Sequence, residues 1–156
     1  MHQPSFQVSF RPNTKLVSTV RRFTEELYEL TMHHDISGKV AIATHELLEN
    51  AVTYASDGLA GVRIEVTDGK LVVRTWNRTS PSHLAAVMAK IDEMNQVADA
   101  DEYYQLMLNK TAYRTDGSGL GLARIRAEAE MSITYEVVNE HLHIKAIAPL
   151  TPAVMQ

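Results

Sequence analysis

Cysteine is absent from this chain of 156 residues, which excludes disulfide bonds and any metal site built on thiolates. Long apolar runs are absent too, since none approaches the roughly 20 residues that a membrane-spanning helix needs. The first residues also lack the basic and then apolar order of a secretory signal. We therefore expect a cytoplasmic protein that has no membrane as a partner.

Positive charge is scarce. The chain has 15 Lys and Arg residues against 19 Asp and Glu residues, for a formal net charge of −4 and a pI near 5.9. A protein that binds nucleic acid without sequence preference needs a broad positive field, which this composition does not supply. We therefore expect no nucleic acid among the partners.

The apolar content is sufficient for one folded domain. Apolar residues make up 45% of the chain and charged residues 22%, and a chain of this length can bury a substantial core. We expect a single domain over residues 1–148. The proline-containing residues 149–156 are expected to form a flexible C-terminal tail.

Apolar and polar residues alternate with a period of two in several short segments, as in strands that bury one face. These segments are 5–11, 62–67, 71–76, 133–137 and 142–146. Asp68-Gly69-Lys70 and Asn139-Glu140-His141 lie between consecutive segments and have the composition of turns. The last four segments are therefore predicted to form two antiparallel hairpins.

The segment after Pro12 has the periodicity of an amphipathic helix, which Asn13 or Thr14 could cap. Its apolar stripe, with steps of four and three, consists of Leu16, Val20, Phe23, Leu27 and Leu30. Such a stripe either faces the core or forms a seam between two copies of the chain. The repeat is too short to demand a coiled coil, so we expect it to face the core, and a homodimer stays open.

Further helices are predicted over residues 37–56, 84–97, 100–108 and 120–130, with Asp35 or Ser37 as the cap of the first. The polar residues 77–82 are expected to form a loop, and the polar, glycine-containing stretch 110–118 a mobile connection. The predicted fold class is α/β, an α+β sandwich with a mostly antiparallel sheet and helices on one face.

The second predicted helix carries Glu46 and Asn50, which are four residues apart and therefore share one face of the helix. A carboxylate beside an amide oxygen suits a divalent ion such as Mg²⁺. The carboxylate could also accept a proton from an attacking hydroxyl. Alternatively, the pair is ordinary polar surface, because exposed helices commonly present Glu and Asn at this spacing.

Gly117, Gly119 and Gly121 occupy alternate positions at the start of the last predicted helix. Glycines allow backbone N–H groups to approach an anion, and the positive end of the helix dipole attracts phosphate. The pattern is neither a phosphate-binding loop ending in Gly-Lys-Ser/Thr nor a dinucleotide fingerprint that follows a buried strand. The segment is either a phosphate cradle or a helix start with a flexible hinge.

Together the two segments resemble a known superfamily. Glu46-x-x-x-Asn50-Ala51 resembles the N box of the gyrase, heat-shock chaperone, histidine kinase and MutL (GHKL) superfamily, and Gly117-x-Gly119-Leu120-Gly121-Leu122 resembles its second glycine box. The resemblance covers residues 37–146 and is greatest to the SpoIIAB and RsbW branch of small serine/threonine kinases. Within it, residues 77–122 are similar to SiaB-like kinases, which act on SiaC-like proteins.

The resemblance implies a Bergerat-type, histidine-kinase-like ATPase domain acting as a partner-switching protein kinase with ATP and Mg²⁺ as cofactors. Glu46 would be the catalytic base and Asn50 the magnesium ligand. The partner would be an antagonist-type regulatory protein, either a STAS domain or a SiaC-like protein. The implied nucleotide-binding residues are Asn50, Asn77, Lys110, Arg114, Gly117, Ser118, Gly119, Leu120 and Gly121.

The chain also departs from the superfamily. Its first glycine box is missing, and Asn77-Arg78-Thr79-Ser80-Pro81 stands in that place. The amide oxygen of Asn77 could accept a hydrogen bond from an adenine amino group and replace the usual aspartate. Lys110 and Arg114 are either lid cations that reach the terminal phosphate or solvated loop charges. The missing box favours a second hypothesis, a non-catalytic partner-binding switch with the same fold.

Overall fold

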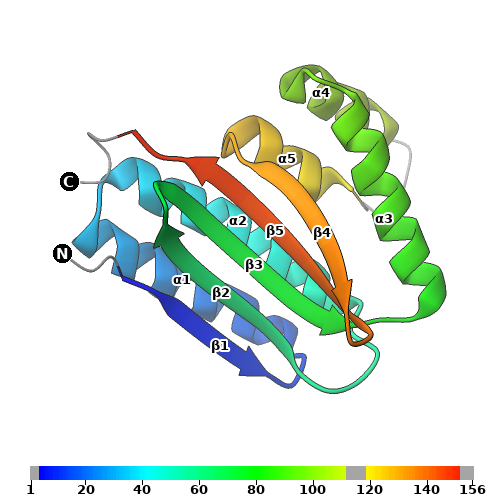
Figure 1. Ribbon diagram of the computed structural model, residues 1–156, viewed down its shortest axis with the longest axis horizontal. Helices are drawn as coiled ribbons and strands as arrows, with labels where there is room; N and C mark the ends of the chain where they lie inside the picture. The colour runs from blue at the N-terminus through cyan, green and yellow to red at the C-terminus, as the bar shows by residue number, and fades with distance from the viewer. Residues whose placement is uncertain (1–3, 112–118, 152–156) are drawn as a thin grey trace.

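The computed structural model describes residues 4–111 and 119–151, which form five strands and five helices. In chain order these are β1 (Phe6–Phe10), α1 (Thr14–Thr31), α2 (His34–Thr53), β2 (Ala60–Thr67), β3 (Lys70–Arg78), α3 (Pro81–Gln96), α4 (Ala100–Thr111), α5 (Leu120–Glu128), β4 (Ser132–Val138) and β5 (His141–Pro149). The strands form one antiparallel sheet in the order β1-β2-β3-β5-β4. Helices α1, α2 and α5 lie behind one face of this sheet, and α3 runs beside the β4 edge (Figure 1). The predicted fold class is confirmed.

The hairpins form where turn chemistry and alternation agree. Asp68 and Gly69 both have positive φ, 50° and 72°, as the tight turn of a two-residue hairpin requires. On β3 the residues Leu71, Val73 and Thr75 are buried, and their neighbours are not. This period of two buries one face of the sheet against the helices and leaves the other face open.

Helix α2 lies at the centre of the helical layer. Its fully buried residues are Ile36, Val40, Ala43, Thr44, Leu47 and Leu48. The helix begins at His34, and His33 caps it by accepting a hydrogen bond at Nδ1 from the Asp35 N–H, 3.2 Å away. The prediction of Asp35 or Ser37 as the cap was therefore wrong, because a histidine nitrogen supplies the acceptor that sequence rules assign to an oxygen.

Helix α1 differs from the prediction in the face that it buries. Its buried residues are Val17, Val20, Thr24 and Tyr28, whereas Phe23 is 57% exposed and Leu30 is 78% exposed. The buried polar groups have partners, since the Thr24 hydroxyl donates to the Val20 carbonyl at 2.9 Å. A hydroxyl that donates to a carbonyl of its own helix keeps a hydrogen bond when it is buried, so its burial costs little free energy. Of the expected core-facing stripe, Val20 is buried, and Leu27 is partly buried and packs against the core.

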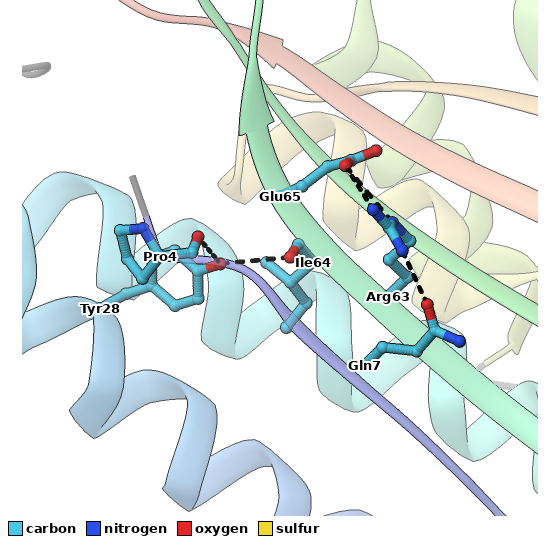
Figure 2. Close-up of polar contacts among 6 residues, drawn as sticks. All are labelled: Pro4, Gln7, Tyr28, Arg63, Ile64 and Glu65. Carbon is cyan, nitrogen blue, oxygen red and sulfur yellow. Dashed lines mark hydrogen bonds and ion pairs between the residues drawn. The ribbon is translucent and has the colours of Figure 1, made fainter. Parts of the chain in front are cut away.

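Tyr28 joins α1 to β2 and to the residue that leads into β1. Its hydroxyl donates to the carbonyls of Pro4, at 2.8 Å, and Ile64, at 3.3 Å (Figure 2). Arg63 bridges β1 and β2, because its guanidinium donates to Gln7 on β1 at 2.8 Å and to Glu65 on its own strand, β2, at 3.1 Å (Figure 2). The short β1 strand is thus held by polar contacts in addition to its backbone pairing.

Two boundaries differ from the sequence prediction. Helix α4 continues to Thr111 and includes Lys110, which was predicted to lie in a mobile connection. Strand β5 includes Pro149, and the Leu150 N–H donates to the Gly69 carbonyl at 2.9 Å. Residues 149 and 150, which were predicted to belong to a flexible tail, therefore complete the end of the sheet. Within residues 4–111 and 119–151, no helix has the length and apolar character needed to cross a membrane.

Candidate functional site

A cavity of about 580 Å³ lies between α2, α3 and the start of α5. This volume falls in the range of typical small-molecule pockets. The residues that line it are Glu46, Glu49, Asn50, Thr53, Tyr54, His83, Ala86, Val87, Lys90, Gly119, Gly121 and Leu122. The structure therefore brings the acid–amide pair of α2 and two of the predicted glycines to one cavity.

The packing of α2 directs Glu46 and Asn50 toward this cavity. Leu47, Leu48 and Ala51 are buried in the core. Glu46 and Asn50 each precede one of these buried residues and therefore lie at the border of the core-facing side of the helix. The Glu46 side chain is only 15% exposed, which removes much of the water around a carboxylate that faces the cavity.

Helix α5 starts at the glycine turn. Gly119 is its N-cap with a φ of 88°, a left-handed conformation that favours glycine. A Cβ placed on Gly121 would overlap Oε2 of Glu46, so the backbone of α5 lies directly against that carboxylate. Two glycines are thus required here, one by backbone conformation and one by close approach.

Lys90 brings a cation to the glycine turn. A Cβ placed on Gly119 would stand only 2.8 Å from Lys90 Nζ. Arg126 on α5 donates to the carbonyls of Met94, at 2.9 Å, and Val97, at 2.8 Å, and so ties the C-terminal end of α3 to α5. This tie keeps Lys90 beside the first turn of α5.

Arg124 forms an ion pair with Glu46. Its Nη1 lies 3.1 Å from Glu46 Oε1, while its Nε donates to Glu128 at 2.7 Å. One carboxylate oxygen of Glu46 therefore accepts a hydrogen bond from a cation, and the other lies against Gly121. The contact orients the carboxylate.

An aromatic pair lines another part of the cavity. The rings of Tyr54 and His83 stack with centroids 3.8 Å apart and planes inclined by 17°. Nε2 of His83 is buried and has no hydrogen-bond partner among the described residues. Burial also lowers the pKa of His83, which favours the neutral ring.

Residues 77–81, which stand where the first glycine box would be, lead into α3. Ser80 caps this helix by accepting a hydrogen bond from the His83 N–H at 3.2 Å, and Pro81 is the first helical residue. The prediction of a loop through residue 82 was therefore wrong, because the Ser-Pro pair suits a helix start. Asn77 is 3% exposed and donates to the Arg78 carbonyl at 3.1 Å. It does not line the cavity.

The other predicted nucleotide-binding residues lie elsewhere. Lys110 is exposed in the last turn of α4, and Leu120 packs against the core instead of lining the cavity. Arg114, Gly117 and Ser118 lie outside the described residues. The sequence analysis did not identify His83 and Lys90 as residues of the site. They are seven positions apart, and with residues 86 and 87 between them they fall on one face of a helix, which is the signal that could have found them.

Comparisons with known proteins show a likeness in fold. No protein family matches the chain by sequence, and no curated protein does. The fold is similar to a chain in the crystal structure of the SiaB–SiaC complex from Pseudomonas aeruginosa, with a TM-score of 0.64 and 16% sequence identity. The match covers 92% of this chain and 88% of the other. At this identity the likeness concerns the fold, which the two chains share over nearly their whole length.

Proposed function

We propose that this protein is a cytoplasmic partner-switching serine/threonine kinase of the GHKL superfamily that transfers the γ-phosphoryl group of ATP to a SiaC-like regulatory protein. The observation that carries the proposal is that Glu46 and Asn50 face the same cavity as Gly119 and Gly121. The shared fold with a chain of the SiaB–SiaC complex supports a SiaC-like partner over a STAS domain.

The cavity has groups that suit each part of a nucleotide. The stacked rings of Tyr54 and His83 offer an apolar face to a purine. The first turn of α5 presents backbone N–H groups and a positive dipole to phosphates. Lys90, beside that turn, adds a full positive charge.

The amide oxygen of Asn50 suits Mg²⁺, an ion that takes oxygen ligands and commonly shares them with phosphates. Bound Mg-ATP would supply the transferred phosphoryl group and the charge neutralisation that the transfer requires. Glu46 would accept the proton of the attacking serine or threonine hydroxyl as that oxygen bonds to phosphorus and the bond to the ADP oxygen breaks. Arg124 would hold Glu46 in the required orientation.

The test uses two carboxylates that line the same cavity. The protein is incubated with radiolabelled Mg-ATP and a SiaC-like protein encoded by a neighbouring gene, and labelled partner is counted. Glu46→Gln should reduce transfer by about a hundredfold or more, in the range that a general base contributes. Glu49→Gln, an exposed residue paired with His45 at 3.5 Å, serves as the matched control and should have little effect. Equal transfer by the wild type and Glu46→Gln would refute the role of Glu46.

A non-catalytic switch of the same fold is the second candidate, and the position of Asn77 favours it. This residue is the proposed replacement for the adenine-binding aspartate, but its amide is buried against the backbone of its neighbour. Calorimetry and thermal unfolding with millimolar Mg-ATP separate the two functions. A ligand that binds the native state raises its stability, so the absence of both heat and a thermal shift would support the switch.

A further inference from the structure

The sheet has one face that none of the described helices covers. Helices α1, α2 and α5 lie behind the sheet, and its front is open in Figure 1. Because buried and exposed positions alternate along β3 and β5, every second side chain of these central strands points to the open face. Six partly exposed side chains do so: Val72, Arg74, Trp76, His143, Lys145 and Ile147.

Three cations form a row across the middle of this open face. Arg63 on β2 is directly opposite Arg74 on β3, and Arg74 is directly opposite Lys145 on β5. Side chains in such cross-strand positions have Cβ atoms about 4.5–5.5 Å apart, and like charges placed there destabilise the sheet. The row therefore costs the free protein stability unless an anion approaches it.

Arg63 is neutralised within the chain, but the other two cations are not. The Arg63 guanidinium forms an ion pair with Glu65 at 3.1 Å and donates to Gln7 (Figure 2). Among residues 4–111 and 119–151, neither Arg74 nor Lys145 has an ion pair or a side-chain hydrogen bond. Two neighbouring positive charges thus remain uncompensated on the open face.

Trp76 forms an aromatic platform beside these cations. A Cβ placed on Gly61 would overlap the indole ring, so the ring lies directly over the β2 backbone. His143 is opposite Trp76 on β5, and the two rings lie with centroids 6.2 Å apart and planes inclined by 23°. Burial, followed by the charge of Arg74, lowers the pKa of His143, which favours the neutral ring. Trp and Arg are enriched among the residues that dominate protein interfaces.

The charges around the row favour a protein over a nucleic acid as the acidic partner. Glu65 and Glu136 lie on the same face, opposite Val72 and His143, and the chain has a net charge of −4. These carboxylates would repel a continuous line of phosphates, whereas a protein can present carboxylates only where the cations lie. Pairing of the open face with that of a second copy would bring the two rows of cations together.

The spacing of the two uncompensated cations fits a helix. Residues four apart on a helix have Cβ atoms about 5–6 Å apart, which is close to the separation of about 4.5–5.5 Å for directly opposite residues such as Arg74 and Lys145. Side chains on one face of an extended segment are about 6.5–7 Å apart and match less well. A helix on the open face would also add a layer of the kind that covers sheets in folded domains.

We infer that the open face of the sheet is a docking surface for an acidic helix of another protein, which pairs two carboxylates with Arg74 and Lys145 and lays an apolar side chain on Trp76. The inference does not depend on the proposed kinase function, because none of these three residues lines the cavity. The cavity lies among the helices, on the other side of the sheet.

The fluorescence of Trp76 provides a direct test, because it is the only tryptophan of the chain. The probe is a synthetic helical peptide without tryptophan that carries glutamates four residues apart and leucines on the same face. Its control carries lysines in place of the glutamates. The acidic peptide should bind the full-length protein and shift the Trp76 emission, more weakly as salt is added, and the lysine peptide should not. Arg74→Glu/Lys145→Glu should weaken binding of the acidic peptide by about tenfold or more and should bind the lysine peptide instead.

The matched control is Arg11→Glu/Lys15→Glu, which changes the net charge by the same amount at exposed positions outside β2, β3, β4 and β5. It should bind the acidic peptide like the wild type, and circular dichroism should show that both double variants are folded. Equal weakening by the two double variants, or no emission shift in the wild type, would overturn the inference.

Two other occupants of the open face give distinct results. Tighter binding of a short oligouridine than of the acidic peptide, lost in Arg74→Glu/Lys145→Glu, would identify a nucleic-acid surface. An emission shift that depends on protein concentration without any peptide, and that the same variant loses, would identify a second copy of the chain. Either result would overturn the inference.

Discussion

Arg124 donates from Nη1 to Oε1 of Glu46 across 3.1 Å and so joins two helices whose contacting residues are 78 positions apart in the sequence. Arg124 lies three residues after Gly121, within the first turns of α5. The ion pair therefore holds the glycine turn against the carboxylate. We infer that Arg124 is a positioning residue for Glu46.

Replacing Arg124 with alanine tests this positioning role. The Arg124 side chain is 43% exposed, so the loss of its ion pairs should lower the free energy of unfolding by only about 1 kcal/mol or less. Under the proposed function, phosphoryl transfer should fall by about tenfold or more, since misplacing the proposed base slows the reaction strongly. Single-turnover transfer and urea unfolding measure the two effects.

The control for this variant is Glu128→Gln, which alters the other carboxylate that contacts Arg124 at 2.7 Å and leaves the Glu46 contact in place. It should retain transfer close to the wild-type rate. If both variants slow transfer equally, the effect comes from general weakening of α5 and the positioning role is rejected.

Gly121→Ala and Gly38→Ala should change stability in opposite directions. A methyl group at Gly121 would overlap Oε2 of Glu46, so α5 must shift, at a cost of about 1–3 kcal/mol. At Gly38, within α2, the added Cβ meets no atom within 4 Å, and alanine should stabilise the helix by up to about 1 kcal/mol. Urea unfolding of both variants measures the difference, and a stabilised Gly121→Ala would contradict the close contact.

Tyr28→Phe should destabilise the protein by about 1–2 kcal/mol. The substitution removes the donor that serves the Pro4 and Ile64 carbonyls, and a buried acceptor without a donor is costly. Burial, followed by the charge of Glu65, raises the pKa of Tyr28, so the hydroxyl keeps its proton and donates across the physiological range. Tyr104→Phe, whose hydroxyl lies 3.4 Å from Glu128 at the surface, should cost less in the same urea experiment.

Stability should fall as the solution becomes acidic. Burial lowers the pKa of both His83 and His143, and Arg74 adds to the effect at His143. Below the ordinary histidine pKa of about 6.5, the unfolded chain binds protons that these folded residues do not bind. Their contribution to stability is therefore complete above this pH and is lost progressively below it.

Thermal unfolding between about pH 8 and pH 5.5 measures this dependence, and the double variant His83→Gln/His143→Gln should flatten it. An unchanged slope in the double variant would show that other groups cause the acid sensitivity.

Turn composition and the helical repeat predicted the features that depend only on residues close together in the sequence. The Asp68-Gly69 turn was predictable because two consecutive residues with positive φ require residues that tolerate this conformation. The shared face of Glu46 and Asn50 follows from the helical repeat alone. The buried face of α1 was mispredicted, because hydrophobicity does not report that the hydroxyls of Thr24 and Tyr28 find acceptors inside the protein.

The sequence by itself determined the two hairpins, the helix with its acid–amide pair, and the glycines before the last helix, since each depends on neighbours close in the sequence. Only the tertiary structure decided that α5 brings Gly121 against Glu46 and that α3 brings Lys90 to Gly119. These contacts join segments distant in sequence, and the packing of whole helices on the sheet sets them. No local periodicity encodes the position of one such segment relative to another.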